Sequence, residues 1–109
     1  MIEVKAIVRP ERLENVLHAV REVAGVGGVT VSRVEGFGRQ QPPRADTGEF
    51  GHAVMAKVET VILREAMTSV VEAITAAAFT GRPGDGKVFV LPVETVIDIR
   101  AAQGGQSKV

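Results

Sequence analysis

A strand followed by an amphipathic helix occurs twice along this chain, and this repeat constrains the fold more than any other feature. Residues 2–8 largely alternate apolar and polar types, as a strand with one buried face does. Pro10 favours a first helical turn, and residues 13–24 carry one apolar stripe at helical spacing. Glycines at 25, 27 and 28 are predicted to end this helix, and residues 29–35 have the β-branched composition of the next strand.

The second half repeats this scheme, with a strand over 53–62, an apolar helical stripe over 67–78, a glycine turn over 81–86 and a strand from Lys87. Two βαβ units with right-handed crossovers most economically form a four-stranded antiparallel sheet that carries both helices on one face. We therefore predict a single α+β domain over residues 1–109, a ferredoxin-like βαββαβ sandwich. Its other sheet face is bare and partly apolar, which predicts packing against further copies.

Three segments fall outside the repeat. Residues 36–52 show almost no periodicity and contain two prolines and four charged residues. This composition predicts a loop of about 15 residues, a length typical of functional or disordered loops. Residues 93–100 have strand composition again. Residues 101–109 are small and polar, and we expect this tail to fray.

Composition excludes several classes of protein. The chain has no cysteine, which rules out disulfides and thiolate sites and favours the reducing cytoplasm. Its net charge is zero and its aromatic residues are four phenylalanines, so a nucleic-acid partner is not expected. No apolar run approaches the roughly 20 residues that cross a bilayer, and the N-terminus lacks signal-peptide features. We expect a cytoplasmic protein without membrane insertion.

The stretch Thr80–Lys87 places flexible backbone and a cation between a helix and a strand, an order that suits an anion pocket. Its G-x-x-x-x-G-K spacing is that of a P-loop. However, Val88 follows the lysine where a P-loop has Ser or Thr, and a strand follows where a P-loop opens a helix. The P-loop fold is therefore excluded, whereas phosphate binding is not.

A second glycine run, Gly36–Gln40, lies at the corresponding place in the first βαβ unit. Two interpretations are open. The runs form an anion site in which glycine N–H groups hold oxygens and Arg39, Lys87 and Arg100 neutralise charge, or they are ordinary turns with solvated cations. The two histidines, His18 and His52, do not suggest a metal site, and no hydroxyl has a neighbouring base, so no catalytic residue is predicted.

Three runs together carry a resemblance to a known family: Lys5–Pro10, Gly36–Gln40 and Thr80–Val90. They closely resemble the PII signal-transduction family, and the match spans nearly the whole chain. The resemblance implies a homotrimer of ferredoxin-like subunits that binds adenine nucleotides in the clefts between subunits. It also implies a T-loop, here about residues 40–54, that docks onto a membrane transporter or an enzyme.

The resemblance also implies roles for single residues. Thr30 would meet the adenine, and Arg39, Gly84, Gly86 and Lys87 would meet the phosphates. Gln40 would be a magnesium ligand only if MgATP binds, and with Lys57 it would hold 2-oxoglutarate or another small anion such as bicarbonate. The implied nucleotide-binding set is Thr30, Gly36, Gly38, Arg39, Gln40, Gly84, Asp85, Gly86, Lys87 and Arg100.

The chain departs from the family pattern in ways that bear on its ligand. It has no tyrosine, which excludes uridylylation of the T-loop. Val61 aligns with a common glutamate, and Asp98 aligns with the first of two phosphate-side arginines, leaving Arg100. A carboxylate in place of that cation predicts weaker triphosphate binding, so ADP or AMP is the expected effector, with ATP possible.

We therefore expect a divergent PII-like regulator with a role in inorganic-carbon metabolism. The alternatives are a nitrogen-regulatory PII protein that binds ATP and 2-oxoglutarate, and a small nucleotide phosphohydrolase.

Overall fold

The computed structural model of the chain describes residues 1–43, 51–100 and 102. Helices and strands alternate in the order that the sequence predicts, and a short 3-10 turn precedes each helix. The elements are β1 (Ile2–Val8), η1 (Pro10–Arg12), α1 (Leu13–Arg21), β2 (Thr30–Pro43), β3 (Gly51–Ile62), η2 (Arg64–Ala66), α2 (Met67–Ala78) and β4 (Gly86–Pro92).

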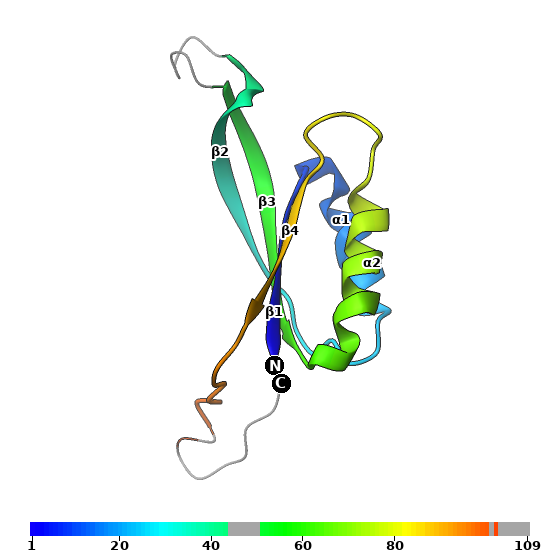
Figure 1. Cartoon of the computed structure of the whole chain (residues 1–109), viewed down its shortest axis with the longest axis vertical. Helices are drawn as coiled ribbons and strands as arrows, with labels where there is room; N and C mark the ends of the chain where they lie inside the picture. Colours follow the sequence, from blue (N-terminus) through cyan, green and yellow to red (C-terminus); the bar gives the residue numbers. More distant parts are fainter. Residues whose placement is uncertain (44–50, 101, 103–109) are drawn as a thin grey trace.

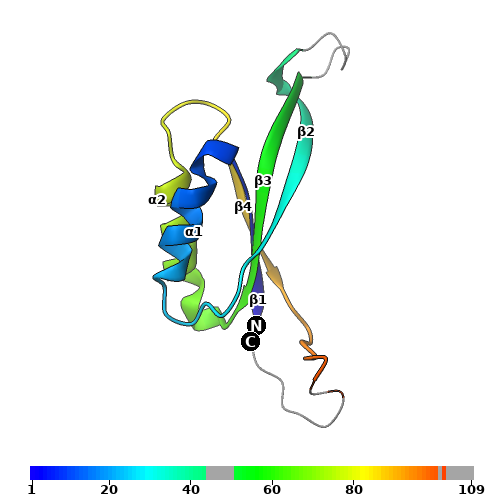
Figure 2. The ribbon, with the colours of Figure 1, turned by 180° about the vertical axis from the view of Figure 1, so that it is seen from behind.

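The strands form one antiparallel sheet in the order β2-β3-β1-β4. Both helices cover the same face of this sheet, as Figures 1 and 2 show from opposite sides. The predicted ferredoxin-like α+β fold is therefore confirmed. Because β1 lies in the middle of the sheet, its inward residues are the centre of the core.

The core lies between the sheet and the two helices. Every second residue of β1 is at most 1% exposed, and these residues pack with Val16 and Val20 of α1 and with Val70 and Ile74 of α2. Burying each such aliphatic side chain contributes about 1.5–3 kcal/mol, an upper value because the unfolded chain is not fully extended. The alternation read from residues 2–8 therefore identified the buried face correctly.

The first helix is shorter than its apolar stripe predicts. It ends at Arg21 rather than near Ala24, and the N–H of Val23 donates to the carbonyl of Val20 at 3.1 Å in a tightened last turn. Val23 still packs against the core, so the stripe continues although the helix has ended. Gly25 then adopts a φ of 93°, the left-handed conformation expected of a glycine that follows a helix.

The predicted loop over residues 36–52 is wrong over most of its length. Strand β2 continues to Pro43 and β3 begins at Gly51, with a register shift between Gly38 and Pro43. These strand ends form an arm that extends past the helices (Figure 1). Residues 44–50 lie outside the described residues, so within the predicted T-loop 40–54 the described parts are strand.

The sequence of the arm has no apolar period, and its strands extend past the helices that cover the rest of the sheet (Figure 1). Its helix-side surface carries instead the ring of Phe37 stacked on that of His52, with ring centroids 4.9 Å apart. His52 Nε2 also lies 3.0 Å from Glu35 Oε1. Such local cross-strand pairs stabilise a strand pair without the alternation that sequence reading depends on.

The predicted strand over residues 93–100 is also wrong. The N–H of Val93 still donates to the carbonyl of Met1 at 3.1 Å, but β1 begins at Ile2 and supplies no partner beyond that point. A strand needs a neighbour for its N–H and C=O groups, and none of the described strands lies there. The tail at 101–109, apart from Ala102, lies outside the described residues. None of the described helices is long and apolar enough to cross a membrane.

Candidate functional site

The turn between α2 and β4 has a backbone that only glycine allows. Gly81, Gly84 and Gly86 adopt φ values of 85°, 93° and 111°. A Cβ atom on Gly86 would lie 1.7 Å from the carbonyl oxygen of Ile7, which no rearrangement of a side chain can relieve. The turn is therefore pressed against the end of β1, and this contact fixes where Lys87 leaves it.

Hydrogen bonds inside the turn converge on Asp85. Its Oδ2 accepts the N–H of Thr80 at 2.8 Å, and its Oδ1 accepts the Thr80 hydroxyl and, at 3.0 Å, Nε of Arg9. These bonds, those from Thr80 first, hold the pKa of Asp85 well below its ordinary value of 3.8. Asp85 was predicted to bind nucleotide, yet both of its oxygens already accept hydrogen bonds from the protein.

The turn is expected to resist acid. Because the pKa of Asp85 is lowered on folding, the stabilisation from its carboxylate is complete above the unfolded pKa and is lost only as the pH falls through the lower, folded value. In an NMR titration, the Thr80 N–H resonance should therefore stay constant through pH 3.8. A titration midpoint at that pH would contradict the hydrogen-bonded turn, and Asp85→Asn provides the baseline without a titrating group.

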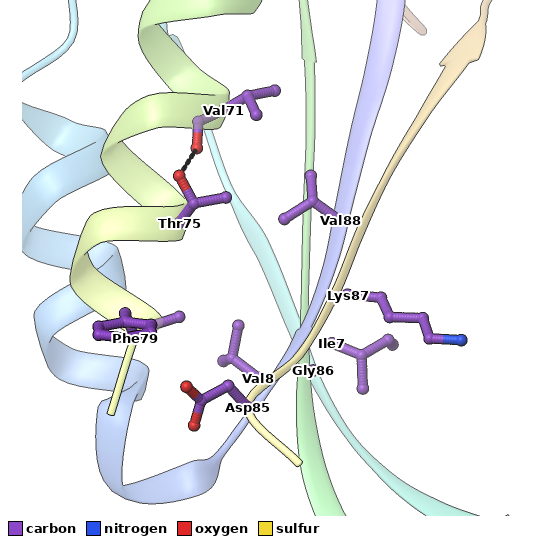
Figure 3. Close-up of a pocket in the computed structure, with 10 residues that line it drawn as sticks. Ile7, Val8, Val71, Thr75, Phe79, Asp85, Gly86, Lys87 and Val88 are labelled. Carbon is purple, nitrogen blue, oxygen red and sulfur yellow. Dashed lines mark hydrogen bonds between the residues drawn. The ribbon is translucent and has the colours of Figure 1, made fainter. Parts of the chain in front are cut away.

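Lys87 and Lys57 lie on the bare face of the sheet, on either side of Ile7. The register pairs Ile7 with Lys57 on β3 and with Lys87 on β4, which sets the two lysines roughly 10 Å apart, two strand spacings. Figure 3 shows the Lys87 side chain pointing away from α2. Lys57 Nζ lies 3.5 Å from Glu59 Oε1, whereas Lys87 is exposed. This row can attract an anion.

The opposite, helix-facing side of the turn borders a cavity of about 380 Å³ between α2 and β4 (Figure 3). Its wall is mostly apolar. Val8 of β1 and Val88 of β4 line it on the sheet side, and Val71 of α2 and Phe79, just after α2, line it on the helix side. The ring of Phe79 is 68% exposed. Asp85 and Lys87 supply the charged groups at its border, and both oxygens of Asp85 accept hydrogen bonds from the protein.

The first glycine run, Gly36–Gln40, lies in β2, at the edge of the sheet opposite β4. Strands β3 and β1 separate the two runs, although both lie toward the end of the sheet where β1 finishes at Val8. Within one chain, the two glycine runs that were predicted to form one site are therefore not adjacent in the sheet. The side chains of residues 38–40, which include the predicted phosphate and magnesium ligands, lie outside the described part of the structure.

Thr30 lines a different cavity, of about 270 Å³, with Thr60 and Val61. The carboxyl groups of Glu3 and Glu59 also border it, and their mutual hydrogen bond, followed by burial, raises the pKa of Glu3. Neither the turn nor Lys87 reaches this cavity. Thr30, the predicted adenine residue, is thus separate from the phosphate turn of its own chain.

Arg100 follows a segment that leads away from the turn. Residues 93–100 lie toward the end of the molecule opposite the turn in both views (Figures 1 and 2). The backbone N–H of Arg100 donates to Oδ1 of Asp98 at 2.9 Å, a local turn rather than a strand. Within a single chain, Arg100 therefore does not join Lys87.

Sequence reasoning missed Arg9. It lies in the Lys5–Pro10 run but was given no role, and its guanidinium donates to Asp85 and to the carbonyl of Pro83 in the turn. The sequence did contain a clue to this contact: a cation, Arg9, just before a predicted helix, and a carboxylate, Asp85, inside the glycine turn. Among the described residues, no group of three or more histidines or carboxylates is placed to hold a metal ion.

Comparison with known proteins gives consistent results. The family model described as Nitrogen regulatory protein P-II matches residues 1–103. Nitrogen regulatory protein P-II of Azospirillum brasilense is 39% identical over 109 residues, 96% of each chain. The protein of the same name from Nostoc punctiforme is 45% identical over 107 residues, 94% of this chain and 95% of that protein. The Nitrogen regulatory protein P-II homolog of Arabidopsis thaliana is 41% identical over 109 residues, but the chain spans only 55% of its length.

Proposed function

The chain belongs to the nitrogen regulatory protein P-II family, and we propose that it senses adenine nucleotides and signals their level to another protein. It is a regulatory signal-transduction protein rather than an enzyme, as the names of its relatives indicate. The observation that carries the proposal is the glycine turn that sets Lys87 beside Ile7 and Lys57 on the bare face of the sheet. A glycine-rich backbone with an adjacent cation is an arrangement that suits phosphate oxygens.

The proposed assembly is a homotrimer with the nucleotide between subunits. Thr30 and Arg100 lie away from the turn within one chain, which supports a site in which a second copy supplies them. Exposed apolar side chains support burial by other copies: Phe89 on the bare sheet face is 45% exposed, and Ile97 and Ile99 are 70% and 86% exposed. The arm formed by β2 and β3, with the T-loop 40–54, would then project toward a transporter or enzyme.

The effector is proposed to be ADP or AMP in preference to ATP. Asp98 places a carboxylate where the family pattern has an arginine, and an anion there opposes the additional charge of the γ-phosphate. With ATP, Gln40 would be the residue for magnesium, and Lys57 would meet 2-oxoglutarate or bicarbonate. Calorimetric titration with AMP, ADP and MgATP tests this order. Clearly tighter binding of MgATP, strengthened by 2-oxoglutarate, would instead support the nitrogen-regulatory interpretation.

Replacing Lys87 with glutamine is expected to weaken ADP binding roughly 10- to 100-fold, the loss of one charge-assisted hydrogen bond. Lys87 is exposed, so the thermal unfolding temperature should barely change. Lys5→Gln is the matched control, because Lys5 lies on the same sheet face but pairs with Glu59 and Phe89. Calorimetric titration of both variants with ADP measures the two affinities. An equal loss in the two variants would indicate a general effect of charge and not a phosphate contact.

A further inference from the structure

Arg9 connects the end of β1 to the glycine turn more than 70 residues later. Its Nε donates to Asp85 Oδ1 at 3.0 Å, and its Nη2 donates to the carbonyl of Pro83 at 2.5 Å. The guanidinium also lies against Gly84, since a Cβ there would be 3.3 Å from Nη2. Its side chain is only 20% exposed. A single planar group therefore holds the turn by hydrogen bonds at Pro83 and Asp85, on either side of Gly84.

These contacts leave Arg9 poorly placed to bind a ligand. The two donors that the structure places are directed at protein acceptors, and the adjacent carboxylate neutralises the charge. What the contacts do is restrict the backbone between Thr80 and Gly86, a stretch that is otherwise rich in glycine and poor in apolar anchors. A glycine-rich turn without such restraint would lose backbone entropy on ordering around a ligand.

We propose that Arg9 and Asp85 form a positioning pair that holds the phosphate-binding turn in its binding conformation before the ligand arrives. This inference rests on the proposed nucleotide site and adds residues that act on the ligand only through the turn. Preorganisation raises affinity because the ordering cost is met during folding. The strongly lowered pKa of Asp85 agrees with an ionised partner for Arg9 throughout the physiological range.

The same segment also restrains the helix that precedes the turn. Nε of Arg12 donates to the carbonyl of Ala77 at 2.8 Å, close to the C-terminal end of α2. Arg9 and Arg12 thus hold the turn and the helix end from one short segment. Arg82, inside the turn, differs from both: its side chain is 62% exposed, and Nη2 lies 3.6 Å from Glu11 Oε2. It therefore serves as a matched cation that carries no positioning contact.

The test combines ADP calorimetry with amide hydrogen exchange of Thr80 and Arg82, whose N–H groups donate within the turn. In Arg9→Gln we expect both amides to exchange at least about tenfold faster and ADP to bind roughly tenfold more weakly. Arg82→Gln removes the same charge and should change either quantity less than twofold. Arg9→Lys keeps the charge but cannot donate from two fixed nitrogens to two acceptors at once, so it should behave like Arg9→Gln.

The double variant Arg9→Gln/Asp85→Asn separates positioning from charge, because its net charge equals that of the wild type. Positioning predicts that it binds no better than Arg9→Gln, whereas recovery of affinity would overturn the proposal. Unchanged exchange and affinity in Arg9→Gln would overturn it as well. If the wild type binds no ADP, the proposed function fails, and the exchange rates still test the pair. Should Arg9→Gln not fold, Asp85→Asn, which keeps the side-chain volume, provides the same readouts.

Discussion

Gly86→Ala is expected to lower the free energy of unfolding by more than about 4 kcal/mol, a large part of the roughly 5–15 kcal/mol that stabilises an ordinary domain. The added methyl group would meet the carbonyl oxygen of Ile7 at 1.7 Å and the carbonyl carbon at 2.8 Å. Both atoms belong to the central strand, whose register with β3 and β4 leaves no direction in which to move. The φ of 111° adds a conformational penalty for any L-residue.

Gly28→Ala is the matched control for that substitution. Its Cβ would meet nothing within 4 Å, and its φ lies outside the left-handed range, so the free energy of unfolding should change by less than about 0.5 kcal/mol. Urea unfolding of both variants, followed by far-UV circular dichroism, measures the difference. If Gly86→Ala were as stable as Gly28→Ala, the turn would not be in close contact with β1. That result would also contradict the position described for Lys87.

The fold was predictable because each element buries one side in a shared core. Val4 on β1, Val16 on α1 and Ile74 on α2 all belong to regular apolar patterns, and the same contacts make those patterns visible and the structure stable. The arm was not predictable, because residues 36–43 extend past the helices (Figure 1) and their sequence has no regular apolar pattern. Residues 93–100 have strand composition, but composition does not reveal that they pair with none of the four described strands.

The candidate site was predictable only in its local parts. The glycine turn and Lys87 are adjacent in sequence, so their pattern contains the chemistry. The Arg9–Asp85 contact joins residues 76 positions apart, and no local pattern specifies it. Asp85 was assigned to the ligand because it lies within the motif, whereas the structure uses it inside the turn. The separation of Thr30 from Lys87 follows from strand order, which the sequence indicates only through the complete topology.

Ile74→Ala is expected to lower the free energy of unfolding by about 2–5 kcal/mol, the usual cost of truncating a buried isoleucine. Ile74 is 1% exposed, on the face of α2 that packs against the sheet, and its neighbours belong to the rigid centre of the core. The cavity would be filled only in part, because β1 is held by strands on both sides. Urea unfolding measures the loss. A change below about 1 kcal/mol would contradict the packing described.

Ile97→Ala removes the same atoms from a side chain that is 70% exposed in the single chain. For an isolated subunit the free energy of unfolding should therefore change by less than about 0.5 kcal/mol. In the proposed trimer, Ile97 is instead covered by another copy, and the same truncation weakens assembly. Its effect on unfolding should then grow as protein concentration rises, whereas the effect of Ile74→Ala should not. Sedimentation velocity, with unfolding at two concentrations, distinguishes the cases, and Ile97→Ala behaving identically at both would remove this residue from the interface.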